Sequence, residues 1–154
     1  MSQARVRIAV VGVGHLGRHH ARLLAQNPRA ELVAVADVRA EAAAKVAEQH
    51  GCEGLTDYRE LFGRVDAVSV VVPTVAHRDV AGEFLAAGVD VFVEKPIAPT
   101  EAEGRELVEL ARCHQRVLQV GHVERFNPAF DALCARGIEP RYIESQRLAP
   151  FSFR

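Results

Sequence analysis

The amino-acid sequence predicts an α/β fold in which helices cover both faces of a doubly wound parallel sheet. Short runs of β-branched residues alternate along the chain with longer segments of helical spacing, a pattern that is typical of such sheets. A glycine-rich turn, Gly12-Val13-Gly14-His15-Leu16-Gly17, directly follows the first run. The 154 residues, 49% of them hydrophobic and 25% charged, have the composition of an ordinary globular domain.

The expected elements follow from these local patterns in chain order. Five strands are predicted over residues 6–11, 31–36, 67–72, 89–93 and 116–120, and five helical segments over residues 16–26, 40–50, 58–62, 75–87 and 101–114. Thr100 and Glu103 have the spacing of a capping box, which places the start of the last helix. Gly88 follows the preceding helix and is expected to end it in a left-handed conformation.

Charge and composition exclude several classes of partner. The net charge of −1 gives no signal for nucleic acid or for an anionic membrane. The three cysteines have no Cys-x-x-Cys spacing, so they indicate free thiols in a reducing cytoplasm and no metal site. The short polar segment before Ile8 predicts no signal peptide, and no apolar stretch approaches membrane-spanning length. We therefore expect a cytoplasmic protein.

The glycine turn has the context of a dinucleotide-binding motif, because it follows a strand and opens a helix. Gly12 permits the tight turn, Gly14 lets the backbone approach a pyrophosphate, and Gly17 lets helix and strand pack closely. The pyrophosphate would lie at the helix N-terminus, where free N–H groups and the helix dipole favour an anion. The alternative is a tight strand-to-helix turn that binds no ligand.

An acidic residue stands where such a motif needs one. Asp37 follows the second strand, 37 − 17 = 20 positions after Gly17. Its carboxylate can accept hydrogen bonds from an adenosine ribose and would repel a 2′-phosphate, which favours NAD over NADP. Arg39 lies nearby and could recruit a phosphate, so NADP remains the alternative.

Lys95 is the candidate for proton chemistry. It follows the strand 89–93, within Glu94-Lys95-Pro96, and is one of two lysines among 19 Lys and Arg residues. A primary amine can move a proton, whereas a guanidinium stays protonated. The alternative is a surface lysine before a proline turn.

The pattern changes after Gly121. A helix is expected over residues 129–136, ending at Gly137, and an alternating strand over residues 141–148. We interpret residues 1–125 as a dinucleotide-binding domain. Residues 126–154 would be a connecting helix and the first strand of a truncated substrate and oligomerisation domain. The finish on a lone strand favours a fragment of a longer enzyme.

Taken together, the motifs resemble the N-terminal NAD(P)-binding Rossmann domain of the glucose–fructose oxidoreductase / inositol dehydrogenase / MocA (Gfo/Idh/MocA) family. The resemblance covers essentially the whole chain and rests on the glycine turn, Asp37, Val72-Pro73-Thr74 with His77, Glu94-Lys95-Pro96, and Gly121-His122-Val123-Glu124-Arg125-Phe126-Asn127-Pro128. It implies an NAD(P)-dependent oxidoreductase of sugars, sugar nucleotides or cyclitols, and a homo-oligomer when full length. In the family a second, α+β domain, apparently absent here, supplies most substrate contacts.

The resemblance also implies a role for each matching residue. Lys95 would be the catalytic residue, reaching the nicotinamide-side ribose and the substrate hydroxyl, and Arg125 and Asn127 would lie near the substrate. Glu94 would bind the nicotinamide-side ribose. The implied cofactor-binding residues are Gly12, Gly14, His15, Leu16, Gly17, Asp37, Val38, Arg39, Val72, Pro73, Thr74, His77, Glu94, Lys95, His122 and Arg125.

Several of these residues have structural alternatives. His77 could start a helix and need not contact the cofactor. Arg125 could pair with Glu124 or Glu144. The neighbouring His19 and His20 are expected on a solvated helix face.

The implied reaction is hydride transfer between a substrate hydroxyl carbon and the nicotinamide. The family's acid/base pair, Asp-x-x-x-His, is missing, because none of the six aspartates has a histidine four positions later. The preferred substrate expectation is a UDP-N-acetylglucosamine 3-dehydrogenase reaction, with inositol or simple-sugar oxidation as the alternative. A stand-alone, non-catalytic NAD-binding module is the alternative of a different class.

Overall fold

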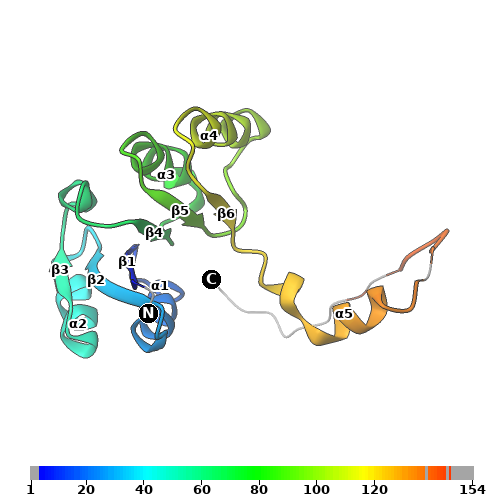
Figure 1. The fold of residues 1–154 in the computed structure, drawn as a ribbon, viewed down its shortest axis with the longest axis horizontal. Coiled ribbons are helices and arrows are strands. Elements are labelled where there is room, and N and C mark those ends of the chain that lie inside the picture. Colours follow the sequence, from blue (N-terminus) through cyan, green and yellow to red (C-terminus); the bar gives the residue numbers. More distant parts are fainter. Residues whose placement is uncertain (1–3, 138, 145, 147–154) are drawn as a thin grey trace. The chain divides into compact units, whose positions relative to one another are not determined.

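The computed structural model describes residues 4–137, 139–144 and 146, and the chain divides into two compact units, residues 1–122 and 123–154. The first unit is built on a six-stranded parallel sheet (Figure 1). Its strands are β1 (Val6–Val11), β2 (Ala30–Ala36), β3 (Glu53–Leu55), β4 (Ala67–Val70), β5 (Asp90–Val93) and β6 (Leu118–Val120). Their order, β3-β2-β1-β4-β5-β6, is that of a doubly wound dinucleotide-binding sheet, as predicted.

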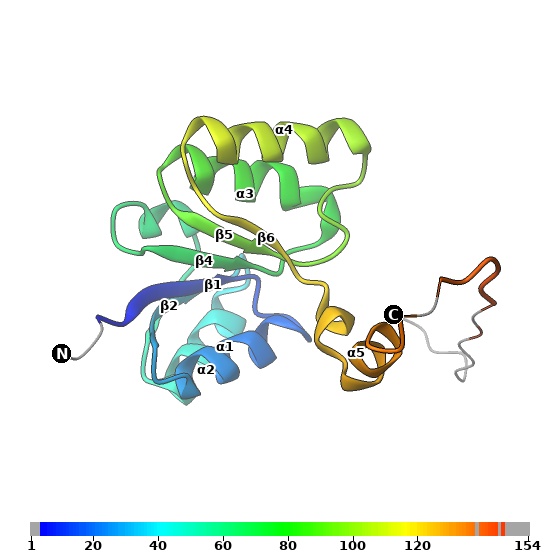
Figure 2. The ribbon, with the colours of Figure 1, turned by 45° about the vertical axis from the view of Figure 1, so that its right-hand side comes forward.

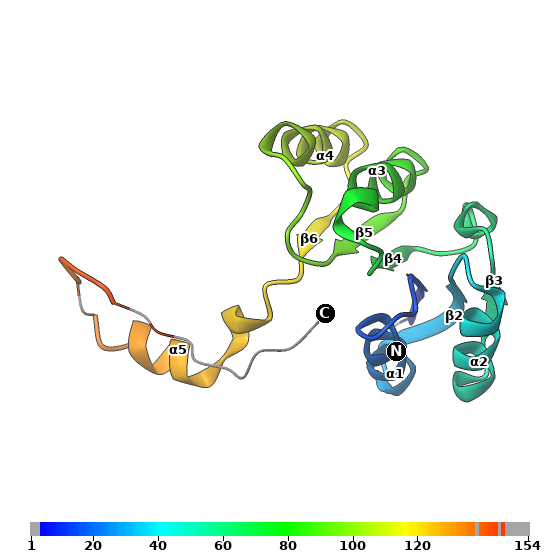
Figure 3. The same cartoon turned by 180° about the vertical axis from the view of Figure 1, so that it is seen from behind.

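Helices cover both faces of this sheet. One face carries α1 (Gly17–Gln26) and α2 (Ala40–His50), and the other carries α3 (His77–Ala86) and α4 (Glu101–Cys113), as Figures 2 and 3 show from two sides. A hydrophobic cluster lies on each side: Val10, Val35 and Val46 belong to the α1–α2 side, and Phe84 and Leu107 to the α3–α4 side. Strands buried on both faces explain why the strand segments are almost continuously apolar.

The structure corrects three sequence-based expectations in the first unit. The strand β3 was missed because it has only three residues, and a run that short has no readable period. The expected helix 58–62 is a single 3₁₀ turn, Tyr58–Leu61, with Asp57 accepting the N–H of Arg59. The expected helix 75–87 is divided into a 3₁₀ turn, Thr74–Ala76, and α3.

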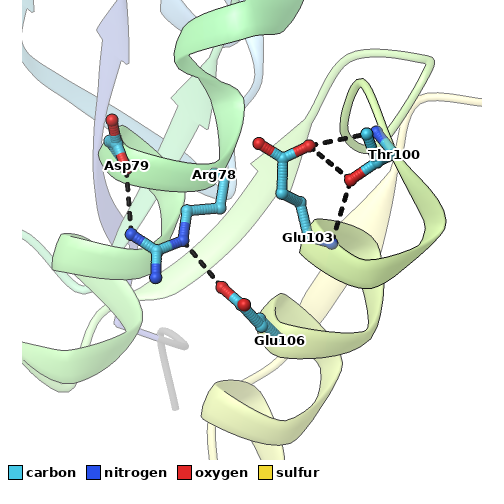
Figure 4. A network of polar contacts seen from close by, with 5 residues as sticks. All are labelled: Arg78, Asp79, Thr100, Glu103 and Glu106. Atoms are coloured by element: carbon cyan, nitrogen blue, oxygen red, sulfur yellow. Dashed lines mark hydrogen bonds and ion pairs between the residues drawn. The ribbon is translucent and has the colours of Figure 1, made fainter.

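The predicted helix signals are confirmed where they concern caps. Thr100 accepts the N–H of Glu103 at 3.3 Å, and the Glu103 carboxylate accepts the N–H of Thr100 at 3.1 Å, so the capping box forms (Figure 4). Gly88 has a φ of 78°, the left-handed conformation expected after α3.

An exposed ion pair joins α3 and α4. Figure 4 shows Arg78 of α3 donating to Glu106 of α4 at 2.9 Å, and an exposed pair of this kind adds little stability.

The first part of the second unit is helical. It contains a 3₁₀ turn, Val123–Phe126, and α5 (Pro128–Cys134). Asn127 caps α5 by accepting the N–H of Ala129 at 3.0 Å, which moves the expected helix 129–136 slightly toward the N-terminus. The strand expected over residues 141–148 falls partly on 145 and 147–148, outside the described residues, and positions 141–144 and 146 form no strand.

Across the described residues, no helix is long and apolar enough to cross a membrane.

Candidate cofactor site

The candidate residues of the first unit lie at the carboxyl ends of the strands. The strands are parallel, so the loops that follow β1, β2, β4 and β5 emerge at one edge of the sheet. The strand order reverses between β1 and β4, the place where sheets of this kind bind ligands. The topology therefore brings together the glycine turn, Asp37, Val72-Pro73-Thr74 and Glu94-Lys95-Pro96.

Protein packing requires glycine at two positions of the turn. Gly12 has a φ of 87°, and a Cβ there would lie 2.7 Å from the Val71 carbonyl oxygen. A Cβ on Gly17 would lie 1.8 Å from the Gly12 carbonyl oxygen, so the start of α1 can only pack this closely without a side chain. Gly14 differs, because a Cβ there would meet no protein atom within 4 Å. The open side of Gly14 leaves room for a ligand to approach the backbone.

The start of α1 is suited to an anion. Its N-cap, Leu16, provides no side-chain cap, and the first turn contains no acidic residue. Among the described residues, no hydrogen bond takes up the backbone N–H groups of His15, Leu16 and Gly17. Free N–H groups and the helix dipole at a helix N-terminus favour an anion, and the backbone of Gly14 just before this helix is open to a ligand.

Asp37 is tied to the glycine turn and to its own loop. Its Oδ2 accepts the N–H of Val13 at 3.0 Å, and its Oδ1 accepts the N–H and Nε–H of Arg39 at 3.0 and 3.1 Å. Partial burial alone would raise the pKa of the Asp37 carboxyl, but the hydrogen bonds from Arg39 and Val13 outweigh it, so the pKa is lowered. Asp37 is therefore an ionised acceptor, as a ribose diol requires.

Two neighbours of Asp37 remain accessible. Val38 is 90% exposed, and the Arg39 side chain is 66% exposed although its guanidinium contacts the Asp37 carboxylate. A ribose would have to share this carboxylate with Arg39 or displace its exposed side chain.

The His77 side chain is buried between two loops. It is 1% exposed, its Nδ1 lies 2.9 Å from the Pro96 carbonyl oxygen, and its Nε2 lies 3.0 Å from the Val72 carbonyl oxygen. His77 thus both starts α3 and connects the loop after β4 with the loop after β5. Pro73 is exposed and Thr74 partly buried beside it.

Glu94 and Lys95 differ in their surroundings. The Glu94 side chain is 17% exposed, and its Oε2 accepts the N–H of Lys95 at 3.2 Å. The Lys95 side chain is exposed. Glu94 is therefore held by the fold, whereas the Lys95 amine is accessible to a ligand at this edge.

The sequence-based interpretation missed His20, Ser69 and the steric role of Gly121. Contrary to the expected solvated face, the His20 side chain is 19% exposed, and its ring contacts Ser69 at 2.9 Å and Glu94 at 3.4 Å. Burial lowers the pKa of His20, although Glu94 opposes the shift, so the ring is neutral at neutral pH. A helical stripe through Gly17, Ala21 and Leu24 would have placed position 20 beside the buried face.

The remaining candidates lie close to the end of the first unit or in the second. His122 is exposed at the end of the first unit. Arg125 lies 3.7 Å from Asp131, and among the described residues it forms no ion pair with Glu124 or Glu144. Asn127 caps α5 and donates to Glu124 at 2.8 Å, so its side chain has a structural task within the second unit.

Comparison with known proteins agrees with this geometry. The family model described as "Oxidoreductase family, NAD-binding Rossmann fold" (Gfo/Idh/MocA) matches residues 6–122. The match covers most of the chain, and the chain belongs to that family. The predicted family, Rossmann fold and NAD cofactor are thereby confirmed.

Individual relatives are dehydrogenases. The chain is 41% identical over 150 residues to UDP-N-acetylglucosamine 3-dehydrogenase of Acidithiobacillus ferrooxidans, covering 97% of this chain and 47% of that protein. A solved structure of that enzyme matches with a TM-score of 0.82 and 38% identity, over 88% of this chain and 44% of that one. Inositol 2-dehydrogenase of Rhizobium meliloti is 37% identical over 129 residues, or 83% of this chain and 39% of that protein.

One solved relative contains the cofactor. GenD2 from gentamicin A biosynthesis, in complex with NAD, matches with a TM-score of 0.75 and 32% identity, over 77% of this chain and 35% of that one. The chain spans less than half the length of each of these relatives. The open cradle at Gly14, the free N–H groups of α1 and the ionised Asp37 fit the pyrophosphate and adenosine ribose of NAD.

Proposed function

We propose that this protein is an NAD-dependent oxidoreductase that oxidises the hydroxyl at carbon 3 of UDP-N-acetylglucosamine. The observation that carries the proposal is the placement of Glu94 and Lys95. The largely buried Glu94 carboxylate, which accepts the N–H of Lys95, and the accessible Lys95 amine both follow β5. They lie at the edge of the sheet where the glycine turn and Asp37 also lie. The 41% identity to a dehydrogenase of that name supports this choice of substrate.

Each residue of this edge has a distinct task in the proposal. The N–H groups at the start of α1 bind the pyrophosphate, Asp37 accepts from the adenosine ribose, and Glu94 accepts from the nicotinamide-side ribose. NAD, when bound, supplies the group that accepts the hydride. These contacts fix the position of the cofactor relative to Lys95.

Lys95 acts on the substrate oxygen. Oxidation of the alcohol removes a hydride from carbon and a proton from oxygen, so negative charge develops on that oxygen. The Lys95 ammonium donates a hydrogen bond to it and lowers the cost of losing the proton. We place the final proton acceptor in the part of the relatives' length that this chain does not span.

A substrate screen of the intact protein tests the proposal. NADH formation is followed by absorbance with UDP-N-acetylglucosamine, other UDP-sugars, inositols and simple sugars. The highest kcat/KM is expected for UDP-N-acetylglucosamine. A preference for inositols would instead establish the second candidate, which the inositol 2-dehydrogenase relative favours. NAD binding without turnover of any of these substrates would establish a non-catalytic NAD-binding module.

We also propose a cytoplasmic homo-oligomer. The three cysteines are free thiols, as expected in a reducing compartment. The second unit exposes several large apolar side chains, and burying them against further protein would be favourable: Phe126, Phe130, Leu133 and Tyr142. Light scattering of the intact protein is expected to give a mass above one subunit, and a monomer would contradict this assembly.

A further inference from the structure

A histidine on α1 touches the loop that carries the proposed active residues. The Nδ1 atom of His20 lies 2.9 Å from the hydroxyl oxygen of Ser69 on β4, and its Nε2 lies 3.4 Å from Oε1 of Glu94. The ring also packs on Phe92 of β5, with centroids 5.7 Å apart. His20 therefore connects the helix after the glycine turn with two adjacent strands of the sheet.

The chemistry of the two partners favours one arrangement of protons on His20. An ionised Glu94 carboxylate only accepts hydrogen bonds, so the ring must present Nε2–H to it. Nδ1 of the neutral ring is then an acceptor, and Ser69 can donate its hydroxyl proton to it. Ser69 is 2% exposed, so this contact also satisfies a buried polar group.

Two further neighbours, Lys95 and Gly121, restrict the position of the Glu94 carboxylate. Its Oε2 accepts the N–H of Lys95 at 3.2 Å. A Cβ on Gly121 would lie 2.7 Å from Oε1 and 3.1 Å from the Glu94 carboxyl carbon. Oε1 thus occupies a narrow space between His20 and Gly121.

We infer that His20 is a positioning residue that orients the Glu94 carboxylate for the nicotinamide-side ribose through its Nε2–H, while Ser69 fixes the His20 ring. The inference rests on the proposed function, in which Glu94 accepts hydrogen bonds from that ribose. His20 acts through Glu94 and needs no contact of its own with the cofactor. The 3.4 Å separation is longer than a formed hydrogen bond and is expected to shorten when the ribose orders the carboxylate.

Two amide substitutions separate the two contacts of the ring. In His20→Gln the amide nitrogen can take the place of Nε2 and donate to Glu94. In His20→Asn the shorter amide can reach Ser69 but not Glu94. The chain is titrated calorimetrically with NADH, which carries both riboses, and with ADP, which carries only the adenosine half. His19→Asn, on the neighbouring exposed position, is the matched control.

The expected result is a selective loss in one variant. His20→Asn weakens NADH binding about fivefold, the weight of one net hydrogen bond, and leaves ADP binding unchanged. His20→Gln and His19→Asn bind both ligands like the parent chain. Equal losses for the Gln and Asn variants, or equal losses for NADH and ADP, would mean that His20 only supports the packing of α1, and would overturn the inference.

Glu94→Gln separates this inference from the proposed function. If Glu94→Gln binds NADH like the parent, the role proposed for Glu94 fails, and the inference fails with it. If Glu94→Gln weakens NADH binding but His20→Asn does not, only the inference fails. In the double variant, adding His20→Asn to Glu94→Gln is expected to cause no further loss of NADH affinity.

If His20→Asn does not fold, Ser69→Ala replaces it. Without the Ser69 hydroxyl the His20 ring is no longer fixed, so NADH binding is expected to weaken and ADP binding to stay unchanged.

Discussion

Gly121 and Glu94 share one space at the edge of the sheet: a Cβ on Gly121 would lie 2.7 Å from Oε1 of Glu94. The N–H of Gly121 donates to the Val93 carbonyl oxygen at 2.8 Å, so the end of β6 is fixed beside the loop that carries Glu94. The absence of a side chain at position 121 therefore leaves room for a carboxylate.

Gly121→Ala is expected to displace the Glu94 side chain. The new methyl group meets the flexible end of Glu94 and the ring of Phe92 at 3.1 Å, so the fold adjusts at a cost of about 1 kcal/mol. NADH binding is expected to weaken about threefold or more, because the carboxylate leaves its place, while ADP binding stays unchanged. Calorimetry with both ligands and urea unfolding measure the two effects. Unchanged NADH affinity would contradict the assignment of Glu94 to the cofactor.

Gly14→Ala and Gly17→Ala are expected to separate ligand binding from folding. Position 14 has no protein atom near a Cβ, so Gly14→Ala should change the free energy of unfolding by less than about 0.5 kcal/mol and weaken NADH binding at least tenfold, roughly. At position 17 the Cβ would overlap the Gly12 carbonyl oxygen, so Gly17→Ala should destabilise the chain by more than about 2 kcal/mol. Urea unfolding and NADH calorimetry of both variants check the contrast. A Gly14→Ala variant with parental NADH affinity would place the pyrophosphate elsewhere.

Arg39→Ala is expected to raise the preference for NAD over NADP. The guanidinium occupies acceptor sites on Asp37, and it is a cation that a 2′-phosphate bound beside this carboxylate would meet. Its removal frees the carboxylate for the ribose diol and leaves the phosphate facing an unscreened negative charge. The ratio of NADPH to NADH dissociation constants should rise about tenfold by calorimetry. A fall in this ratio would mean that Arg39 selects against the phosphate.

Lys95→Ala in the intact enzyme is expected to lower kcat far more than NAD affinity. The amine acts on the substrate oxygen in the proposal, and a positioned group of this kind contributes roughly 10²- to 10⁴-fold. Lys95→Arg should recover little, because the planar guanidinium keeps the charge but differs from the ammonium in size and in the directions of its N–H groups. Steady-state kinetics and NADH calorimetry on both variants separate the two quantities. Near-normal kcat in Lys95→Ala would remove its catalytic role.

The sheet could be predicted from the sequence because its strands are buried on both faces. Val6–Val11 and Ala40–His50 have the predicted bounds, since an apolar run and a helical stripe of that length each give a clear signal. The three-residue β3 gives no such signal. The single turn at Tyr58–Leu61 depends on a local Asp57 cap, which the spacing of apolar residues does not encode.

The candidate site was predictable where backbone chemistry dictates it. Gly12 and Gly17 are required by close approach, and Asp37 follows from its spacing. The contact between His20 and Glu94 could not be predicted, because it joins residues 94 − 20 = 74 positions apart through the register of β4 and β5. The helical stripe through Gly17, Ala21 and Leu24 indicates that position 20 borders the buried face, but it does not indicate which strand residues His20 contacts.

The unusual surroundings of His20 are expected to make the stability of the chain depend on pH. Burial lowers the pKa of the His20 ring, with Glu94 acting in the opposite direction and His19 in the same one. Between this lowered value and the unfolded value of about 6.5, the unfolded chain binds more protons than the folded chain, so the free energy of unfolding rises with pH. The stabilisation is therefore complete above about pH 6.5 and is lost as the pH falls toward the folded pKa. Lowering of the Asp37 pKa acts in a separate window, below about pH 4.

Urea unfolding between about pH 5 and 7.5 measures how steeply the free energy of unfolding rises with pH. This slope should decrease in His20→Gln and persist in His19→Gln. Equal slopes in the parent and His20→Gln would show that the ring is as easily protonated in the folded chain as in the unfolded one.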